Sequence, residues 1–304
     1  VYQQWGTHFD HLFFESEVWE IGKKLVNEHF SLFQESQGAI IFNGEEFGLT
    51  PRVFITSNGT PTYETKELGL ALLEKQEFPA DLFVHIVANE QNDYFRTVFQ
   101  VMALIWPELD GKKKHISYGL VKLPTGKMGS RTGDAIGAEE LVQTLIQEIE
   151  VVMKDRELEP QLKKEIIPNI ARGAIKFMML HTQAKNDIIF DLQKATRLDG
   201  DSGPYLQYAY TRLLSIQNKV ARPEISPDFA LFNDKDWYLV RQLQNLPYIV
   251  ERCAKEFTTH HLSHYLLGIC ADFSSWYAEN SVQNAEAGLK AARLHLVESM
   301  RITL

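Results

Sequence analysis

A glycine-rich segment over residues 115–133 carries the side chains best suited to act on a phosphate group. An apolar, strand-like run leads into a Pro-Thr-Gly turn, and Lys127, Ser130 and Arg131 then follow among three glycines. Glycine lets a backbone close over a ligand, and the lysine and arginine cations can neutralise charge that develops on a phosphate during transfer. The pattern indicates a phosphate-binding loop, with a solvated basic loop as the alternative.

Three further side chains are candidates for binding a substrate. Tyr63 and Glu67 lie four residues apart at the start of a helix expected over residues 65–76, so they share one face. A carboxylate there can pair with a guanidinium through two hydrogen bonds, although a solvated surface glutamate would have the same spacing. Gln91 follows a strand expected over residues 81–87, at the strand end where open parallel sheets bind ligands.

The elements that position these residues alternate between strands and helices. Short runs rich in Val, Ile and Phe predict strands at 38–42, 52–56, 81–87 and 115–123. Apolar residues at helical spacing predict a helix over 138–154, in addition to the helix already described. This alternation favours a parallel sheet covered by helices over the first two-thirds of the chain.

The last third of the chain is expected to be a helical bundle. One apolar stripe runs through residues 243–257 and a second through residues 262–277, both at helical spacing. Such stripes usually form the core between packed helices. Residues 221–236, which hold two prolines and several charges, are the predicted connection between helices.

Composition limits the class of protein. The chain has 304 residues, is 44% hydrophobic and carries a net charge of −9, which is ordinary for a globular protein of two domains. No apolar run approaches the length of a membrane span, and two cysteines are too few for a disulfide framework or a four-cysteine zinc site. His260 and His264 are one helical turn apart but have no third ligand at sensible spacing, so we predict no metal site. A cytoplasmic protein without membrane partners is expected.

The segment 115–133 resembles the KMSKS signature of class I aminoacyl-tRNA synthetases, in the form "HVSYG…LP.GKMS.R.G" that is typical of arginyl-tRNA synthetases. The resemblance implies that Lys127 meets the pyrophosphate charge, that Ser130 and Arg131 support the loop, and that Lys127 and Met128 bind the nucleotide. Gly129 departs from the serine that the family usually has at that position.

Two upstream segments resemble the same family. Residues 57–71 are similar to "SDGTPTY.TRDLA", which implies that Tyr63 and Glu67 hold the substrate arginine, with Glu67 in place of the usual aspartate. Residues 88–100 are similar to "G.EQ..HF.Q.F", which implies that Gln91 contributes to arginine recognition. Tyr94 stands where the family most often has a histidine near the nucleotide.

Downstream segments extend the resemblance to the end of the chain. Residues 200–212 are similar to "G.T.PYLQYAYAR", which leads in this family into the helical anticodon-binding domain. The resemblance implies tRNA contacts from Tyr208 and Arg212, and residues 246–250 and 264–277 look like the same domain.

The resemblance implies an α/β region followed by an all-α region. Residues 1–199 would be the second half of a class I Rossmann-type catalytic domain, and residues 200–304 a helical-bundle anticodon-binding domain that is truncated at its C-terminus. The His-x-Gly-His motif of the first half of the nucleotide fold does not occur in this sequence. We therefore expect a fragment that lacks the N-terminal half.

The implied function is that of an arginine--tRNA ligase, which uses ATP and Mg²⁺ to activate L-arginine and transfers it to tRNA(Arg), with no membrane or DNA partner. The isolated chain is expected to be inactive because the half with the His-x-Gly-His motif is absent. Two alternatives stay open: a non-catalytic tRNA-binding module, and a structural or regulatory protein that has kept the fold without either activity.

Overall fold

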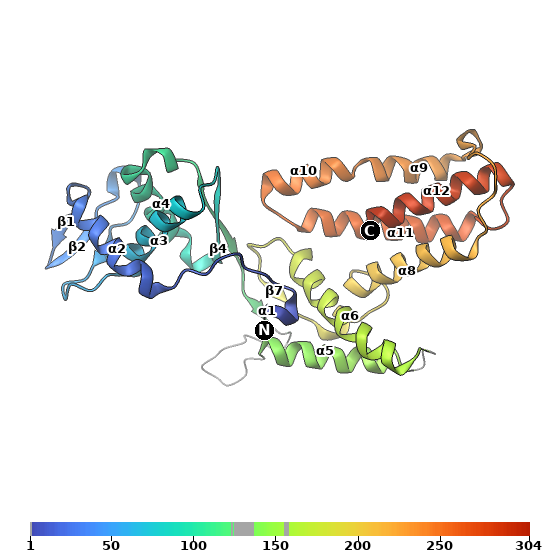
Figure 1. Cartoon of the computed structure of the whole chain (residues 1–304), viewed down its shortest axis with the longest axis horizontal. Helices are drawn as coiled ribbons and strands as arrows, with labels where there is room; N and C mark the ends of the chain where they lie inside the picture. Colours follow the sequence, from blue (N-terminus) through green and yellow to red (C-terminus); the bar gives the residue numbers. More distant parts are fainter. Residues whose placement is uncertain (1, 123, 125–136, 155–157) are drawn as a thin grey trace. The chain divides into compact units, whose positions relative to one another are not determined.

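The computed structural model of the chain describes residues 2–122, 124, 137–154 and 158–304. These residues form two compact units, Tyr2–Leu120 and Val121–Leu304, shown in blue to green and in green to red in Figure 1. The first unit mixes helices and strands, and the second is largely helical. The expected domain boundary between residues 199 and 200 stays a prediction.

The first unit contains four helices and two small sheets in the part of the chain that the structure describes. Its helices are α1 (Tyr2–Trp5), α2 (Glu15–Glu28), α3 (Tyr63–Glu77) and α4 (Asn92–Ile105), joined by the short 3-10 turns η1 (Phe30–Leu32), η2 (Glu45–Phe47), η3 (Asn89–Gln91) and η4 (Pro107–Leu109). Its strands are β1 (Gln34–Ser36), β2 (Ala39–Phe42), β3 (Arg52–Ile55), β4 (Phe83–Ala88) and β5 (Lys113–Tyr118). Fully buried side chains of α2, β3, α3 and α4 form the core, among them Val26, Phe54, Leu68 and Met102.

The sheet topology corrects part of the sequence prediction. Strands β4 and β5 pair in parallel, with Phe83 opposite Lys113, as expected for strands joined by a helix. Strands β1, β2 and β3 instead form an antiparallel sheet. The reason is the length of the connections: Gln37 and Gly38 turn with φ of 50° and 78°, and the segment between β2 and β3 is too short for a crossover.

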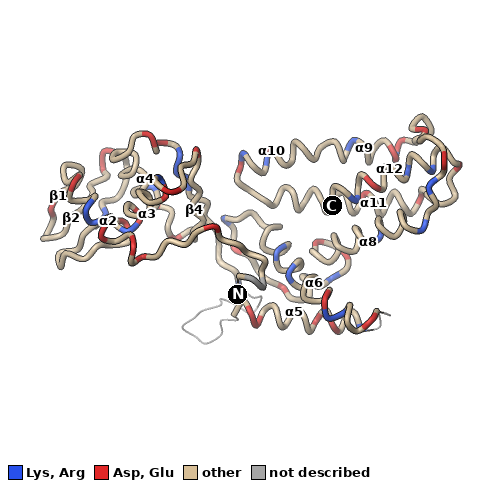
Figure 2. The backbone as a smooth tube through the Cα atoms, in the orientation of Figure 1, with Lys and Arg blue, Asp and Glu red and all other residues tan. Residues whose placement is uncertain are grey.

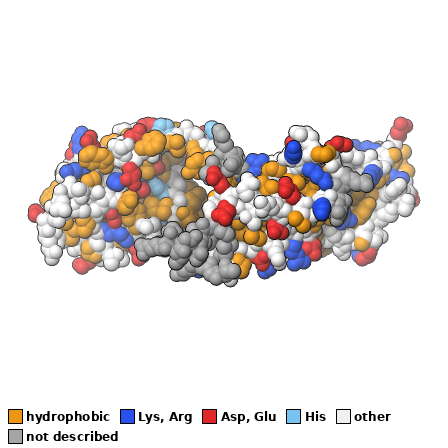
Figure 3. Space-filling model, turned by 90° about the horizontal axis from the view of Figure 1, so that it is seen from below, with side chains coloured by type: hydrophobic (Ala, Val, Ile, Leu, Met, Phe, Trp, Pro, Cys, Tyr) orange, Lys and Arg blue, Asp and Glu red, His pale blue; other side chains and the backbone are white. Residues whose placement is uncertain are grey.

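The parallel pair brings the ends of two strands to one edge. Ala88 and Tyr118, the last residues of β4 and β5, lie opposite each other in the register. Val84 and Ile86 of β4 remain 40% and 67% exposed, and apolar side chains are visible on the surface in the space-filling view (Figure 3). Gln91, which follows β4, therefore lies near the edge of a sheet that has two strands within the described residues.

The second unit is a set of packed helices. They are α5 (Ala138–Val152), α6 (Pro160–His181), α7 (Leu192–Ala195), α8 (Gly203–Lys219), η5 (Phe229–Leu231), α9 (Asp234–Gln244), α10 (Leu246–Glu256), α11 (His260–Glu279) and α12 (Ala287–Thr303), with strands β6 (Val121–Lys122) and β7 (Ile188–Ile189) in parallel. Buried side chains of α8, α9, α11 and α12 form its core, including Leu213, Leu239, Phe273 and Val297. The predicted helical bundle is confirmed. The connection predicted over residues 221–236 is confirmed up to residue 233, because α9 begins at Asp234.

The stripe predicted over residues 243–257 is divided between two helices. Helix α9 ends at Gln244 and α10 begins at Leu246, with Pro247 in its first turn, where the missing N–H is tolerated. The two helices follow one another along α11 (Figure 1). The expectation that this stripe forms core is wrong for α10, which has no buried residue.

Charge is balanced in the helical third. Residues 205–304 contain ten Lys+Arg and ten Asp+Glu, so the net −9 arises from residues 1–204. In Figure 2 the acidic and basic residues of α9 to α12 are interspersed rather than gathered in blocks of one sign. None of the helices in the described residues has both the length and the hydropathy needed to cross a membrane.

Candidate substrate pocket

A cavity of about 540 Å³ in the first unit brings together the three predicted substrate-binding residues, Tyr63, Glu67 and Gln91. It lies between α3, the end of β4 with η3, the start of α4, and β3. Its lining is Arg52, Tyr63, Glu64, Glu67, Val87, Gln91, Tyr94 and Phe95. Most of these side chains are charged, polar or aromatic, so the cavity suits a polar ligand with a charged end.

Glu67 is the carboxyl group of this cavity whose pKa departs from its ordinary value. Its Oε2 atom is buried and has no hydrogen-bond partner within the described structure. Burial raises the pKa of the carboxyl to about 7, helped by the nearby Glu74 and opposed by Lys113. A buried carboxylate without a partner is costly, and a cationic ligand that donates hydrogen bonds would relieve that cost.

Tyr63 and Gln91 lie at more open positions. Tyr63 is the first residue of α3 and is 68% exposed, with the Lys66 ammonium 4.9 Å from the centre of its ring. Lys66 is itself held 2.7 Å from Glu15 of α2. Gln91 ends η3 directly after β4 and is exposed. Both side chains can therefore contact a ligand that enters from solvent.

One wall of the cavity holds a group that the sequence did not single out. Arg52 lies 3.2 Å from Glu64, and its guanidinium lies 5.7 Å from the centre of the Tyr94 ring. Tyr94 is buried, which raises the pKa of its hydroxyl, as do Glu67 and Glu64. The buried Nε atom of Arg52 has no hydrogen-bond partner among the described residues. No local pattern pointed to this cluster, because its members come from β3, α3 and α4.

A second layer of charged groups lies behind the cavity. Lys113 at the start of β5 is almost fully buried and lies 2.6 Å from Glu74 of α3. His85 of β4 is partly buried against the Phe95 and Phe99 rings, and burial together with Lys113 and His115 lowers its pKa to about 4. His85 is therefore neutral at physiological pH, and Lys113 and Glu74 are the charged groups that act on Glu67 from this layer.

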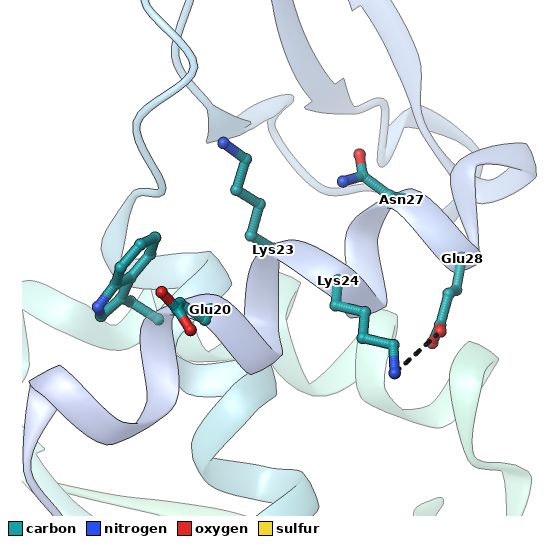
Figure 4. A pocket seen from close by; sticks show the side chains of 6 residues that line it. Glu20, Lys23, Lys24, Asn27 and Glu28 are labelled. Atoms are coloured by element: carbon teal, nitrogen blue, oxygen red, sulfur yellow. Dashed lines mark ion pairs between the residues drawn. The ribbon is translucent and has the colours of Figure 1, made fainter.

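The turn that precedes Tyr63 is held by α2. Gly59 adopts φ of 74°, a conformation that favours glycine, and its carbonyl accepts a hydrogen bond of 2.9 Å from Lys23. Figure 4 shows that Lys23 extends away from the exposed pair of Lys24 and Glu28, which are 3.6 Å apart. These residues line a separate hollow along α2 that contains neither Tyr63 nor Glu67.

The other predicted site residues fall into two groups. Lys127, Met128, Ser130 and Arg131 lie outside the described residues. Tyr208 and Arg212 lie one turn apart on α8, where the Arg212 guanidinium is 5.7 Å from the centre of the Tyr208 ring. The same guanidinium also lies 5.5 Å from the Phe273 ring and 5.7 Å from the Tyr277 ring.

His264 of α11 lies between two other histidine rings. Its ring centre is 4.4 Å from that of His181 on α6 and 5.7 Å from that of His260 on α11. Within the described part of the chain, however, no three His, Cys, Asp or Glu side chains are arranged to hold a metal ion. Both cysteines of the chain, Cys253 and Cys270, are free thiols.

Comparison with known proteins adds independent evidence. Residues 11–192 match the family described as "tRNA synthetases class I (R), catalytic domain", and residues 206–304 match the "DALR anticodon binding domain". The chain is 31% identical over 318 residues to an arginine--tRNA ligase of Treponema pallidum, covering 100% of this chain and 54% of that protein. It is 36% identical over 245 residues to one of Halobacterium salinarum, covering 80% of this chain and 39% of that protein.

A solved structure agrees with these sequence matches. The arginyl-tRNA synthetase of Thermus thermophilus superimposes with a TM-score of 0.86 at 25% identity, covering 99% of this chain and 59% of that one. The chain thus spans about half the length of the curated relatives it matches.

Proposed function

Because this chain belongs to the arginyl-tRNA synthetase family, we propose that it forms the arginine-binding and tRNA-binding part of an arginine--tRNA ligase. The expected fold class, a class I catalytic α/β region followed by an all-α anticodon-binding region, is confirmed by the two family matches and the Thermus structure. The activity, its substrates and the roles of single residues are what we propose.

The observation that carries the proposal is the buried Oε2 atom of Glu67, which has no hydrogen-bond partner among the described residues, in a cavity that Tyr63 and Gln91 also line. A guanidinium is planar, always charged and rich in donors, so it can meet a carboxylate through two parallel hydrogen bonds. An ammonium lacks that fork, which favours arginine over lysine. In this proposal Glu67 pairs with the arginine side chain, while Tyr63 and Gln91 position it.

The family uses ATP, and the loop around Lys127 is its proposed contact in this chain. The arginine carboxylate attacks the α-phosphate of ATP, and pyrophosphate leaves with the electron pair of the broken P–O bond. Lys127 neutralises charge on the pyrophosphate, Ser130 and Arg131 support the loop, and Met128 contacts the nucleotide. Mg²⁺ is expected to accompany the ATP substrate.

The helical unit is the proposed site of tRNA binding. Tyr208 is 41% exposed beside Arg212, so a ring that can stack on a base lies next to a cation that can meet a phosphate. The residues from 205 onward have no net positive charge, so binding would depend on such local contacts rather than on a strongly basic surface. A cytoplasmic location, where tRNA is charged, belongs to the same proposal.

A non-catalytic tRNA-binding module is the second candidate, since the chain spans about half of its relatives. The decisive experiment measures arginine attachment to a bulk tRNA pool with ATP and Mg²⁺, and tRNA binding and arginine binding on the same sample. Attachment of arginine to tRNA would establish that the chain is an active ligase. Binding of tRNA without charging would support the module, and binding of neither ligand would indicate a structural or regulatory protein.

A further inference from the structure

A buried ion pair lies behind the candidate pocket without lining it. The side chain of Lys113 is 3% exposed, and its Nζ atom is 2.6 Å from Oε2 of Glu74 and 4.1 Å from the centre of the Phe83 ring. Glu74 is seven residues after Glu67 on α3, so the two carboxylates lie on the same face of the helix two turns apart. The pair thus places one positive and one negative charge beside the carboxylate that lines the pocket.

The two charges act on Glu67 in opposite directions. Glu74 disfavours the ionised form of Glu67, and Lys113 favours it. The three groups together carry a formal charge of −1, and removal of either member of the ion pair would change that total. Without Lys113, two carboxylates on one face of α3 would share the region with no cation between them.

We propose that Lys113 is a positioning residue for arginine recognition: by neutralising Glu74 from behind the pocket, it keeps Glu67 as the one uncompensated carboxylate available to a guanidinium. The inference rests on the proposed function, because it assigns the pocket to arginine. It assigns Lys113 no contact with the ligand, since Lys113 is not among the residues that line the cavity.

Other titratable or charged groups lie on the elements around Glu67, and they are the same in every variant proposed below. They are Glu15 on α2, Tyr63, Glu64 and Lys66 on α3, Arg52 on β3, His85 on β4, His115 on β5 and Tyr94 on α4. Lys66 is paired with Glu15 at 2.7 Å. Arg52 is paired with Glu64, and the Nε2 atom of His115 is 2.9 Å from the Val87 carbonyl oxygen. All of them are unchanged in the variants below, so a difference between variants reports on Lys113 and Glu74.

The test compares Lys113→Met, Glu74→Gln and the double variant with the unaltered chain. Calorimetry measures the dissociation constant of L-arginine from pH 5.5 to 9 for each protein. In the unaltered chain we expect binding about tenfold weaker at pH 6 than at pH 8, because Glu67 takes up a proton in that range. The pH at the midpoint of this change in affinity should rise by about one unit in Lys113→Met and fall by about one unit in Glu74→Gln. In the double variant it should return to the value of the unaltered chain.

The double variant separates charge from packing. A purely structural role for the ion pair would make the double variant at least as impaired as either single variant, whereas a charge role predicts recovery. Lys24→Met with Glu28→Gln is the matched control, since it makes the same changes in an exposed pair that lines a different hollow. Its midpoint should not move. Circular dichroism establishes that each variant is folded.

A second measurement does not depend on arginine. The Glu67 carboxyl, followed by carbon NMR of the labelled protein and assigned with Glu67→Gln, should titrate in the same order among the variants. If the NMR midpoints follow this order but L-arginine binds at no pH, the proposed function fails while the coupling by Lys113 stands. Equal NMR midpoints in all variants, or a double variant that does not recover, would overturn the inference.

Discussion

Arg293 and Asp236 form a buried ion pair in the interior of the helical unit, in which two guanidinium nitrogens meet the two carboxylate oxygens. The Nε to Oδ1 distance is 3.1 Å and the Nη2 to Oδ2 distance is 3.0 Å. The Asp236 side chain is fully buried and that of Arg293 is 8% exposed. Trp276 donates a further bond of 2.8 Å to Asp236, so α9, α11 and α12 meet at one carboxylate.

Removing one member of this pair is expected to destabilise the helical unit strongly. Asp236→Ala leaves the Arg293 charge buried without its partner, which costs about 3 to 5 kcal/mol of unfolding free energy. Urea denaturation followed by circular dichroism measures this loss. Arg222→Met is the control, because Arg222 forms an exposed pair with Glu298 and should cost less than about 1 kcal/mol. Similar losses in both variants would contradict the role given to the buried pair.

Gly69 allows α3 to lie against α2, and its replacement is the second prediction. A Cβ atom at Gly69 would lie 2.0 Å from the carbonyl oxygen of Val18, which cannot move aside as a flexible side chain could. We expect Gly69→Ala to lower the unfolding free energy by about 1 to 3 kcal/mol, despite the better helix propensity of alanine. Thermal unfolding is the measurement.

Gly268 of α11 supplies the opposite case. Apart from the backbone of its own helix, no atom of the described residues lies within 4 Å of a Cβ placed there, so Gly268→Ala should raise stability by about 0.5 to 1 kcal/mol. If Gly69→Ala were stabilising as well, the close approach of α2 and α3 would not be a constraint on the fold.

Periodic apolar spacing predicted several elements of the chain, but not their partners. The helices expected over 65–76 and 138–154 correspond to α3 and α5. They could be predicted because each buries one face, whose apolar residues recur at helical spacing. The direction in which strands pair depends on the length of the connection, and so the antiparallel sheet around 38–56 was missed. Tertiary pairing overrode the simple alternation rule there.

In the candidate site, too, residues in a local sequence motif could be predicted, whereas residues brought in from other elements could not. Tyr63 and Glu67 were identified from one helix turn and a motif, and the structure places both beside Gln91. Arg52 and Lys113 were missed because a charged residue in a short strand normally faces solvent. Only the tertiary structure shows that these cations pair with partly buried carboxylates of α3.

Acid should weaken the helical unit through the histidines where α6 and α11 meet. Burial lowers the pKa of His181, and His264 lowers it further; burial and the neighbouring His261 and His264 lower the pKa of His260. The unfolded chain therefore binds protons more readily than the folded one, so stability is lost as the pH falls below about 6.5. Urea midpoints from pH 8 to 5 measure the decline, which should be shallower in His264→Gln. An unchanged slope would remove this explanation.

Lys127→Ala tests the phosphate role proposed for the loop. In the complete enzyme we expect adenylate formation to slow by about a hundredfold or more, because one cation that meets charge in the transition state is lost. Arginine affinity should change little, since Lys127 has no role in holding the substrate side chain. Pyrophosphate exchange gives the rate and calorimetry the affinity. An equal loss of both would mean that Lys127 supports ground-state binding instead.

Glu67→Gln tests two effects of the Glu67 carboxylate separately: its effect on the free energy of unfolding and its effect on the affinity for L-arginine. Because burial raises the pKa of Glu67 to about 7 from 4.5, ionisation is harder in the folded chain than in the unfolded one. The favourable contribution of the protonated form is present below pH 4.5 and is lost as the pH rises through 7.

An uncharged amide of the same shape avoids that loss. We expect Glu67→Gln to be more stable than the unaltered chain by about 2 to 3 kcal/mol at pH 8, and to differ little from it at pH 4.5. The same variant should bind L-arginine at least about thirtyfold more weakly at pH 8, and its affinity should no longer change between pH 6 and 8, because no carboxylate remains to be protonated. Urea denaturation and calorimetry on one preparation test both sides. A variant that is less stable at pH 8, or that still binds arginine with the original pH dependence, would show that the carboxylate which pairs with the substrate lies elsewhere.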